Sequence, residues 1–181
     1  MISNFTPPIY AGFITKSLRV AMAVVALVLS GLFHKANART ITTDDKVVYE
    51  VVSESGHTVR VSIENQSIHR DNASFIIIPE IITDPADGQT YTVTGIVAGA
   101  FQATAVTGVD IRAKLTAIPG NTFRNCPNLE TVVFPPTLEN IGGNCFMDAH
   151  KLKTPVLPEG LKVIGANAFC GTYMGLSLIH I

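Results

Sequence analysis

The sequence predicts a β-rich repeat solenoid in the second half of the chain, and three regularities support this prediction. Four phenylalanines recur at intervals of 22, 23 and 23 residues: Phe101, Phe123, Phe146 and Phe169. An isoleucine stands five positions before each of them, at Ile96, Ile118, Ile141 and Ile164, and an aliphatic residue three positions earlier again, at Val93, Leu115, Leu138 and Leu161. Such a register is typical of units that bury their apolar faces only against their neighbours. We therefore expect a right-handed stack in which the phenylalanines pack on one another.

Each unit is expected to contain a strand, a stop and a short return segment. Residues 129–134 alternate between apolar and other positions, which predicts a strand with Val132 and Phe134 pointing inward. Pro135 cannot donate to a β-ladder, so the strand should end there. The same register predicts parallel strands at about residues 75–78, 107–111, 130–134 and 153–157. The segment around Phe146 should be a short turn or helical piece that leads into the next unit.

The residues before the repeats predict a β-hairpin, with strands at 47–52 and 59–63 around a polar turn at 53–57. We interpret residues 39–72 as an N-terminal β cap that covers the first repeat, because an open solenoid end exposes both core and strand edge. The acidic segment Asp84–Gly88 could suggest a calcium loop. It lacks the spaced ligands of an EF-hand, so a plain turn is favoured.

Residues 1–38 have the pattern of an export signal. Lys16 and Arg19 precede an apolar run from Val20 to Phe33, and Ala36-Asn37-Ala38 offers small residues for cleavage after Ala38. The run is shorter than the roughly 20 residues that a membrane span needs, although an uncleaved anchor is the alternative. We expect a secreted or cell-surface protein whose mature chain begins at Arg39.

At the other end, residues 176–181 read as a sequencing artefact, since they match a translated transposon end used in library preparation and break the repeat. The alternative is a divergent final unit. We interpret residues 73–175 as the repeat domain and expect it to continue in the natural protein.

Composition and motifs argue against several classes of function. After Ala38 there are 10 Lys and Arg residues against 14 Asp and Glu residues, so no basic surface for nucleic acid is expected. No catalytic, phosphate-binding or metal-binding motif occurs, which predicts neither an enzyme nor a cofactor; the segment His69-Arg70-Asp71 is only a weak catalytic candidate. Cys126, Cys145 and Cys170 are interpreted as small buried side chains, with a disulfide or metal ligation as alternatives.

The motif Leu-x-x-Val-x-Phe-Pro-x-x-Leu-x-x-Ile at Leu129–Ile141 recurs with Ala-Phe pairs at Ala100-Phe101 and Ala168-Phe169, and with Phe-x-x-Cys-x-x-Leu at Phe123–Leu129. This pattern resembles the BspA-like, surface-antigen type of leucine-rich repeat, found in exported bacterial proteins and some protist surface proteins. It covers about residues 75–172, with departures such as Pro155 at an expected inward aliphatic position. The resemblance implies a leucine-rich-repeat stack used for binding or adhesion, without fixing a partner.

The outward face of the predicted strands is the candidate binding site. Its residues are Phe75, Ile77, Asp110, Glu130, Thr131, Val133, Lys153, Thr154 and Val156. Apolar side chains exposed on a parallel sheet are a common mark of protein binding, although ordinary β-forming residues would give the same pattern. The expected partner is a protein or glycan of a host or neighbouring cell. Two alternatives are a spacer that displays a further domain and the non-catalytic part of an exported enzyme.

Overall fold

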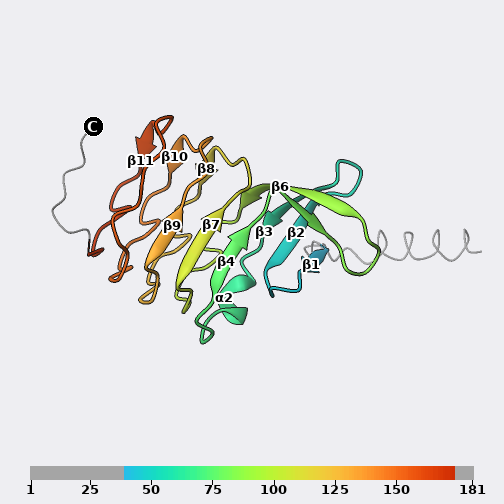
Figure 1. Cartoon of the computed structure of the whole chain (residues 1–181), viewed down its shortest axis with the longest axis horizontal. Helices are drawn as coiled ribbons and strands as arrows, with labels where there is room; N and C mark the ends of the chain where they lie inside the picture. The colour runs from blue at the N-terminus through green and yellow to red at the C-terminus, as the bar shows by residue number, and fades with distance from the viewer. Residues whose placement is uncertain (1–38, 174–181) are drawn as a thin grey trace, which may run out of the picture. The chain divides into compact units, whose positions relative to one another are not determined.

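The computed structural model describes residues 39–173, so the predicted signal, its cleavage after Ala38 and the tail at 176–181 lie outside the described residues. The described chain is β-rich and contains three sheets (Figure 1). Its elements in order are β1 (Thr40–Thr42), β2 (Val48–Ser53), β3 (Thr58–Val61), α2 (Asn65–Ile68), β4 (Phe75–Ile78), β5 (Ile81–Thr83), β6 (Thr90–Ile96), β7 (Gly108–Ile111), β8 (Ala117–Ile118), β9 (Thr131–Val133), β10 (Asn140–Ile141) and β11 (Val163–Ile164).

The first sheet has five strands in the order β1-β2-β3-β6-β5. β2 and β3 occupy the two segments expected for the hairpin and pair antiparallel. β6 pairs parallel with β3 and antiparallel with β5, so strands from residues 81–96 extend the sheet beyond the hairpin. Asp84–Gly88 forms the turn between β5 and β6. The interpretation of residues 39–72 as a cap, and the other domain boundaries, stay predictions.

A buried asparagine completes this sheet. Asn65, at the start of α2, is fully buried and its amide group exchanges two hydrogen bonds of 2.9 Å with the backbone N–H and C=O of Val48. Its Nδ2 also donates to the carbonyl of Ser62 at 2.8 Å. The side chain therefore supplies the acceptor for the buried N–H of Val48 at the start of β2, whose carbonyl also accepts the N–H of Ser62 at 2.9 Å.

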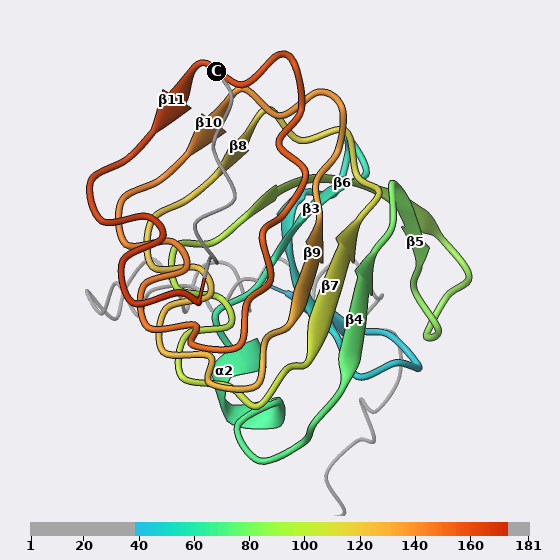
Figure 2. The ribbon, with the colours of Figure 1, turned by 60° about the vertical axis from the view of Figure 1, so that its left-hand side comes forward.

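The repeats form two further sheets, each of three parallel strands, in the orders β4-β7-β9 and β8-β10-β11 (Figure 2). β7 and β8, and likewise β9 and β10, are consecutive strands of one repeat that lie in different sheets. The inward side chains of β4, β7 and β9 are buried, among them Ile76, Val109 and Val132, and Phe134 is also buried as expected. No helix occurs in residues 95–172, where the return segments are turns.

The phenylalanine column stacks as the spacing predicts. Ring centroids of successive residues lie 5.4, 5.4 and 5.1 Å apart, with interplanar angles of 2°, 6° and 11°. The first three rings are fully buried. Backbone hydrogen bonds follow the same direction: the N–H of Phe123 donates to the carbonyl of Cys145 at 2.8 Å, and that of Phe146 to the carbonyl of Ala168 at 2.7 Å. Neighbouring units are thus bonded through their turns as well as through their strands.

Two backbone positions in each turn lie in the left-handed region. The first column is Gly99, Asn121, Asn144 and Asn167, and the second is Ala103, Asn125, Asp148 and Gly171, with φ values between 54° and 73°. Glycine, asparagine and aspartate tolerate this conformation better than other residues do. Apolar spacing in the sequence does not reveal these columns, although asparagine recurs in the first at intervals of 23 residues.

The strand predicted at residues 153–157 is wrong. The N–H of Lys153 donates to the carbonyl of Glu130 at 3.0 Å, which begins the expected ladder. Donors along a parallel strand alternate, so residue 155 should donate next, but Pro155 has no N–H. The ladder stops there, and residues 152–158 have no regular secondary structure.

The expectation for the cysteines holds for two of the three. Cys126 and Cys145 are fully buried, whereas Cys170 is exposed, and all three are free thiols. Burial raises the pKa of the Cys145 thiol because the thiolate would lose its hydration. Cys170 follows Phe169 on the last turn of the described repeats, so no further unit covers it within residues 39–173.

Candidate functional site

The predicted binding residues lie on the outward face of the β4-β7-β9 sheet and its continuation. The strand register places Phe75 opposite Gly108 and Gly108 opposite Thr131, and it places Ile77 opposite Asp110 and Asp110 opposite Val133. These are the columns that alignment of the repeats predicts. The side chains therefore share one face, since alternate residues of a strand point the same way.

At the β4 end of this face, an aromatic ring fills the space above a glycine. Phe75 is 55% exposed, and a Cβ built on Gly108 would lie 2.6 Å from Cδ2 of Phe75 and 2.6 Å from Oγ1 of Thr131. The ring of Phe75 thus leans across β7 toward β9. Ile77, which was expected to be exposed, is only partly exposed.

The face also carries two ion pairs. Asp110 forms an ion pair of 2.8 Å with Arg112, which directly follows the last residue of β7. Glu130 pairs with Lys153 of the next repeat at 3.2 Å, and both side chains are largely exposed. Exposed pairs of this kind contribute little to stability, about 0–1 kcal/mol. Asp110 lies between Ile77 and Val133, whereas the Glu130–Lys153 pair joins the two repeats that also form the apolar end.

The apolar end contains a hollow of about 380 Å³ between β9 and the irregular segment that follows Pro155. Six residues line it: Val132, Val133, Phe134, Pro136, Val156 and Pro158. Val133 is 52% exposed and Val156 is 89% exposed. Because Pro155 interrupts the ladder, residues 156–158 do not pair with β9, and this is the structural origin of the hollow.

The structure therefore divides the predicted site residues. Val133 and Val156 meet at the hollow, Phe75 lies at the opposite end of the face, and Glu130, Thr131, Lys153 and Thr154 are exposed around them. Pro136 and Pro158 are not among the predicted site residues, and Val132 and Phe134 were expected in the core alone. The signal was present in the Phe-Pro-Pro and Leu-Pro sequences that end these units.

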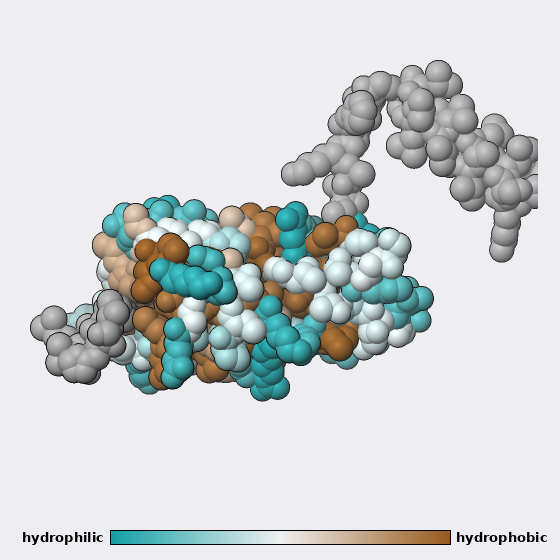
Figure 3. Space-filling view, turned by 90° about the horizontal axis from the view of Figure 1, so that it is seen from above, coloured by the Kyte–Doolittle hydropathy of each residue, from teal (hydrophilic) through white to brown (hydrophobic). Residues whose placement is uncertain are grey.

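Exposed apolar residues also occur elsewhere. Val52, Ile63 and Ile81 lie outside the repeat sheets, and Val163 and Ile164 belong to β11. On the face shown in Figure 3, brown apolar residues are interspersed with teal polar ones. Exposure alone does not distinguish a site, since single exposed apolar side chains are ordinary. The hollow differs because it is concave and its lining residues are all apolar.

The weak catalytic candidate does not form a reactive group. His69 is 2% exposed, its Nδ1 lies 3.1 Å from Oγ of Ser74, and its ring packs 5.9 Å from that of Phe101. Burial lowers the pKa of His69, because the imidazolium would lose its hydration. Arg70 and Asp71 are exposed, so the three side chains do not converge on one substrate position. Within residues 39–173, no three His, Cys, Asp or Glu side chains are grouped so that they could hold a metal ion.

Comparison with known proteins agrees with the repeat geometry. Residues 89–175 match the family described as the BspA type leucine-rich repeat region, in six copies. These residues belong to the BspA-type leucine-rich repeat family. The stacked phenylalanines and the paired parallel strands are thus features of BspA-type repeats in this chain.

Two solved structures share the fold. A leucine-rich repeat protein of Bacteroides capillosus is 25% identical, with a TM-score of 0.60 over 74% of this chain and 92% of that one. A leucine-rich repeat protein of Bacteroides ovatus is 30% identical, with a TM-score of 0.56 over 70% of this chain but only 32% of that one. No curated protein matches the sequence.

BspA-type repeats are in general non-catalytic modules, and leucine-rich repeats generally mediate protein binding. Within the described residues, no helix is long and apolar enough to span a membrane.

Proposed function

We propose that this chain is a secreted or cell-surface repeat module that binds a protein ligand of a host or neighbouring cell. The observation that supports the proposal is the apolar hollow beside β9, with Val133 and Val156 at its rim. A ligand side chain of moderate size would displace water from apolar surface there, which favours binding. The apolar lining favours a protein over a glycan, because sugar hydroxyls need polar partners that these six side chains do not offer.

Two observations support export of the module. Residues 1–38 have the pattern of an export signal, and BspA-like proteins are commonly secreted or surface-bound. In such a protein the repeat face would meet partners outside the cell. The charged pairs on this face would influence orientation and association rate more than affinity.

The test compares two valines of similar exposure. Val133→Asp places a charge at the hollow, and Val52→Asp places one on β2, where the valine is 56% exposed. The purified protein and both variants would be applied to an array of extracellular matrix proteins and glycans. We expect binding to at least one protein spot that falls at least about tenfold in Val133→Asp, because a charge must be desolvated at the rim, and that survives in Val52→Asp.

Binding to glycan spots alone, unchanged by Val133→Asp, would contradict the proposal. A protein that binds no spot in any variant would favour the alternative of a spacer module. Thermal unfolding of both variants serves as the control that neither substitution disrupts the fold.

A further inference from the structure

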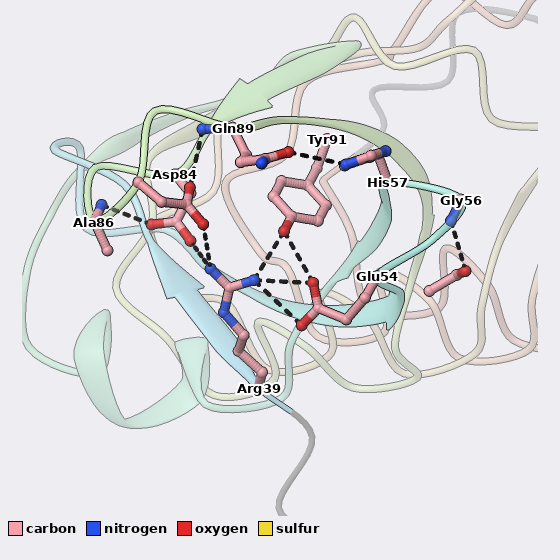
Figure 4. A network of polar contacts seen from close by, with 10 residues as sticks. Arg39, Glu54, Gly56, His57, Asp84, Ala86, Gln89 and Tyr91 are labelled. Carbon is pink, nitrogen blue, oxygen red and sulfur yellow. Dashed lines mark hydrogen bonds and ion pairs between the residues drawn. The ribbon is translucent and has the colours of Figure 1, made fainter. Parts of the chain in front are cut away.

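The guanidinium of Arg39 lies among three carboxylates and a phenol that come from distant parts of the sequence (Figure 4). Its Nη1 donates to Oε2 of Glu54 at 2.9 Å and to the hydroxyl oxygen of Tyr91 at 2.8 Å. Its Nη2 donates to Asp84 and, at 3.3 Å, to Asp87. The guanidinium carbon also lies 5.7 Å from the centroid of the Tyr91 ring, within cation–π range.

The acceptors are held in place by contacts that do not involve Arg39. The Asp84 side chain is only 5% exposed, and its Oδ1 accepts the N–H of Ala86 at 2.8 Å. Oδ1 of Asp87 accepts the N–H of Gln89 at 2.9 Å. The hydroxyl of Tyr91 donates to Glu54 at 3.0 Å. The turn between β5 and β6, which sequence analysis interpreted as a plain turn, thus presents two carboxylates toward one point.

This arrangement suits a guanidinium better than an ammonium. A nearly buried carboxylate such as that of Asp84 is costly unless a cation pairs with it. The donors meet acceptors on both sides of the group, from Glu54 and Tyr91 at Nη1 and from the two aspartates at Nη2. A planar group with several fixed N–H donors satisfies such a set, whereas an ammonium is a compact point charge.

The contacts of the Arg39 side chain also fix the first strand, β1. The backbone carbonyl of Arg39 accepts the N–H of Val51 at 2.8 Å, immediately before β1 begins at Thr40. β1 has three residues and forms an edge of the five-stranded sheet, so its own pairing with β2 is limited. Loss of the side-chain contacts would therefore free β1 and leave the edge of β2 unpaired.

We propose that Glu54, Asp84, Asp87 and Tyr91 form a guanidinium-binding site whose resident ligand is Arg39, and that its occupancy holds β1 on the sheet. If cleavage occurs after Ala38 as the sequence predicts, the ligand is the first residue of the mature chain. The site would then secure the new N-terminus to the sheet that precedes the repeats.

Chemical rescue tests the site directly. Arg39→Ala empties it, and the matched control Arg60→Ala removes an exposed arginine that pairs with Glu50 on the same sheet. We expect the amide of Val51 to exchange about tenfold faster in Arg39→Ala and to stay protected in Arg60→Ala. N-acetylarginine amide at millimolar concentration should bind Arg39→Ala saturably and raise its thermal midpoint, and it should not bind the unsubstituted protein. Absence of binding, or equal rescue by N-acetyllysine amide, would overturn the proposal.

If Arg39→Ala does not fold, a second variant tests whether the Arg39 contacts hold β1 on the sheet. Asp84→Asn keeps an acceptor for the N–H of Ala86 but removes the buried negative charge. We expect this substitution to release the Arg39 side chain. The amide of Val51 should then exchange about tenfold faster, as expected for Arg39→Ala, while amides in β7 and β9 remain protected. Unchanged protection of the Val51 amide in Asp84→Asn would refute the proposal that the Arg39 contacts hold β1 on the sheet.

Discussion

At Gly142 the backbones of two neighbouring repeats lie close together, and an added methyl group there should force them apart. A Cβ on Gly142 would lie 2.3 Å from the nitrogen of Gly120 and 2.6 Å from the carbonyl carbon of Pro119. Non-bonded heavy atoms need about 3.5 Å, so the backbones must separate by about 1 Å. Both contacts are with backbone, so no side-chain rotation can relieve them.

The cost follows from the bonds that this separation weakens. The N–H of Gly142 donates to the carbonyl of Ile118 at 2.8 Å, and the N–H of Asn121 donates to the carbonyl of Gly143 at 3.1 Å. Each bond contributes about 1 kcal/mol net, and overpacking of a rigid region adds about 1–3 kcal/mol. We therefore expect Gly142→Ala to lower the free energy of unfolding by up to about 3–5 kcal/mol, which corresponds to a fall of about 10–15 °C in the thermal midpoint.

Gly160→Ala is the matched control. Its Cβ would meet the carbonyl oxygen of Pro136 at 3.8 Å, an ordinary contact. Both variants restrict the unfolded chain equally, so their difference isolates the clash. Unfolding in urea followed by circular dichroism measures both. Equal stability of Gly142→Ala and Gly160→Ala would refute the view that adjacent repeats are held at this distance by their backbones.

Further predictions concern the core, the turns and the titratable groups. Phe123→Ala removes a stacked, fully buried ring and should cost about 3–5 kcal/mol in urea unfolding. Ala103→Gly should stabilise the protein by about 1 kcal/mol, measured in the same way, because φ is 57° there. Iodoacetamide followed by mass spectrometry should modify Cys170 and spare Cys145, since Cys145 is buried and its pKa is raised. Because the pKa of His69 is lowered in the folded state, the unfolded state binds the proton first as the pH falls. Stability should therefore decrease as the pH drops below about 6.5, and a His69→Gln variant should lose part of that pH dependence.

Periodicity in the sequence was sufficient to predict the structural features that recur in every unit. The phenylalanine stack and the register of β4, β7 and β9 follow from side chains that recur at one spacing and alternate about the strand. Those signals are local and additive, because each unit packs mainly on its neighbours. The left-handed asparagine column was equally periodic, but it reflects backbone conformation rather than burial, and a search for apolar spacing does not detect it.

Features that depend on long-range contact could not be predicted in the same way. Arg39 meets Tyr91 across 52 positions of sequence and Asp84 across 45. Asn65 bonds to the backbone of Val48 across 17 positions, and its burial in three hydrogen bonds has no signal in the surrounding residues. Hydropathy describes which side chains leave water, but it does not describe which polar groups then find one another.

The departures from the repeat are where the surface gains its particular features. Gly108 stands where other repeats carry a side chain and makes room for Phe75. Pro155 replaces an inward aliphatic residue, ends the ladder and opens the apolar hollow. The inserted turn Asp84–Gly88 supplies two carboxylates to Arg39. Each departure gives up a regular contact, and proteins tend to tolerate such losses where a site requires them. Restoring regularity therefore offers a general experiment: Pro155→Val should extend the β9 ladder and raise stability while it closes the hollow, and so reduce any binding that depends on Val133.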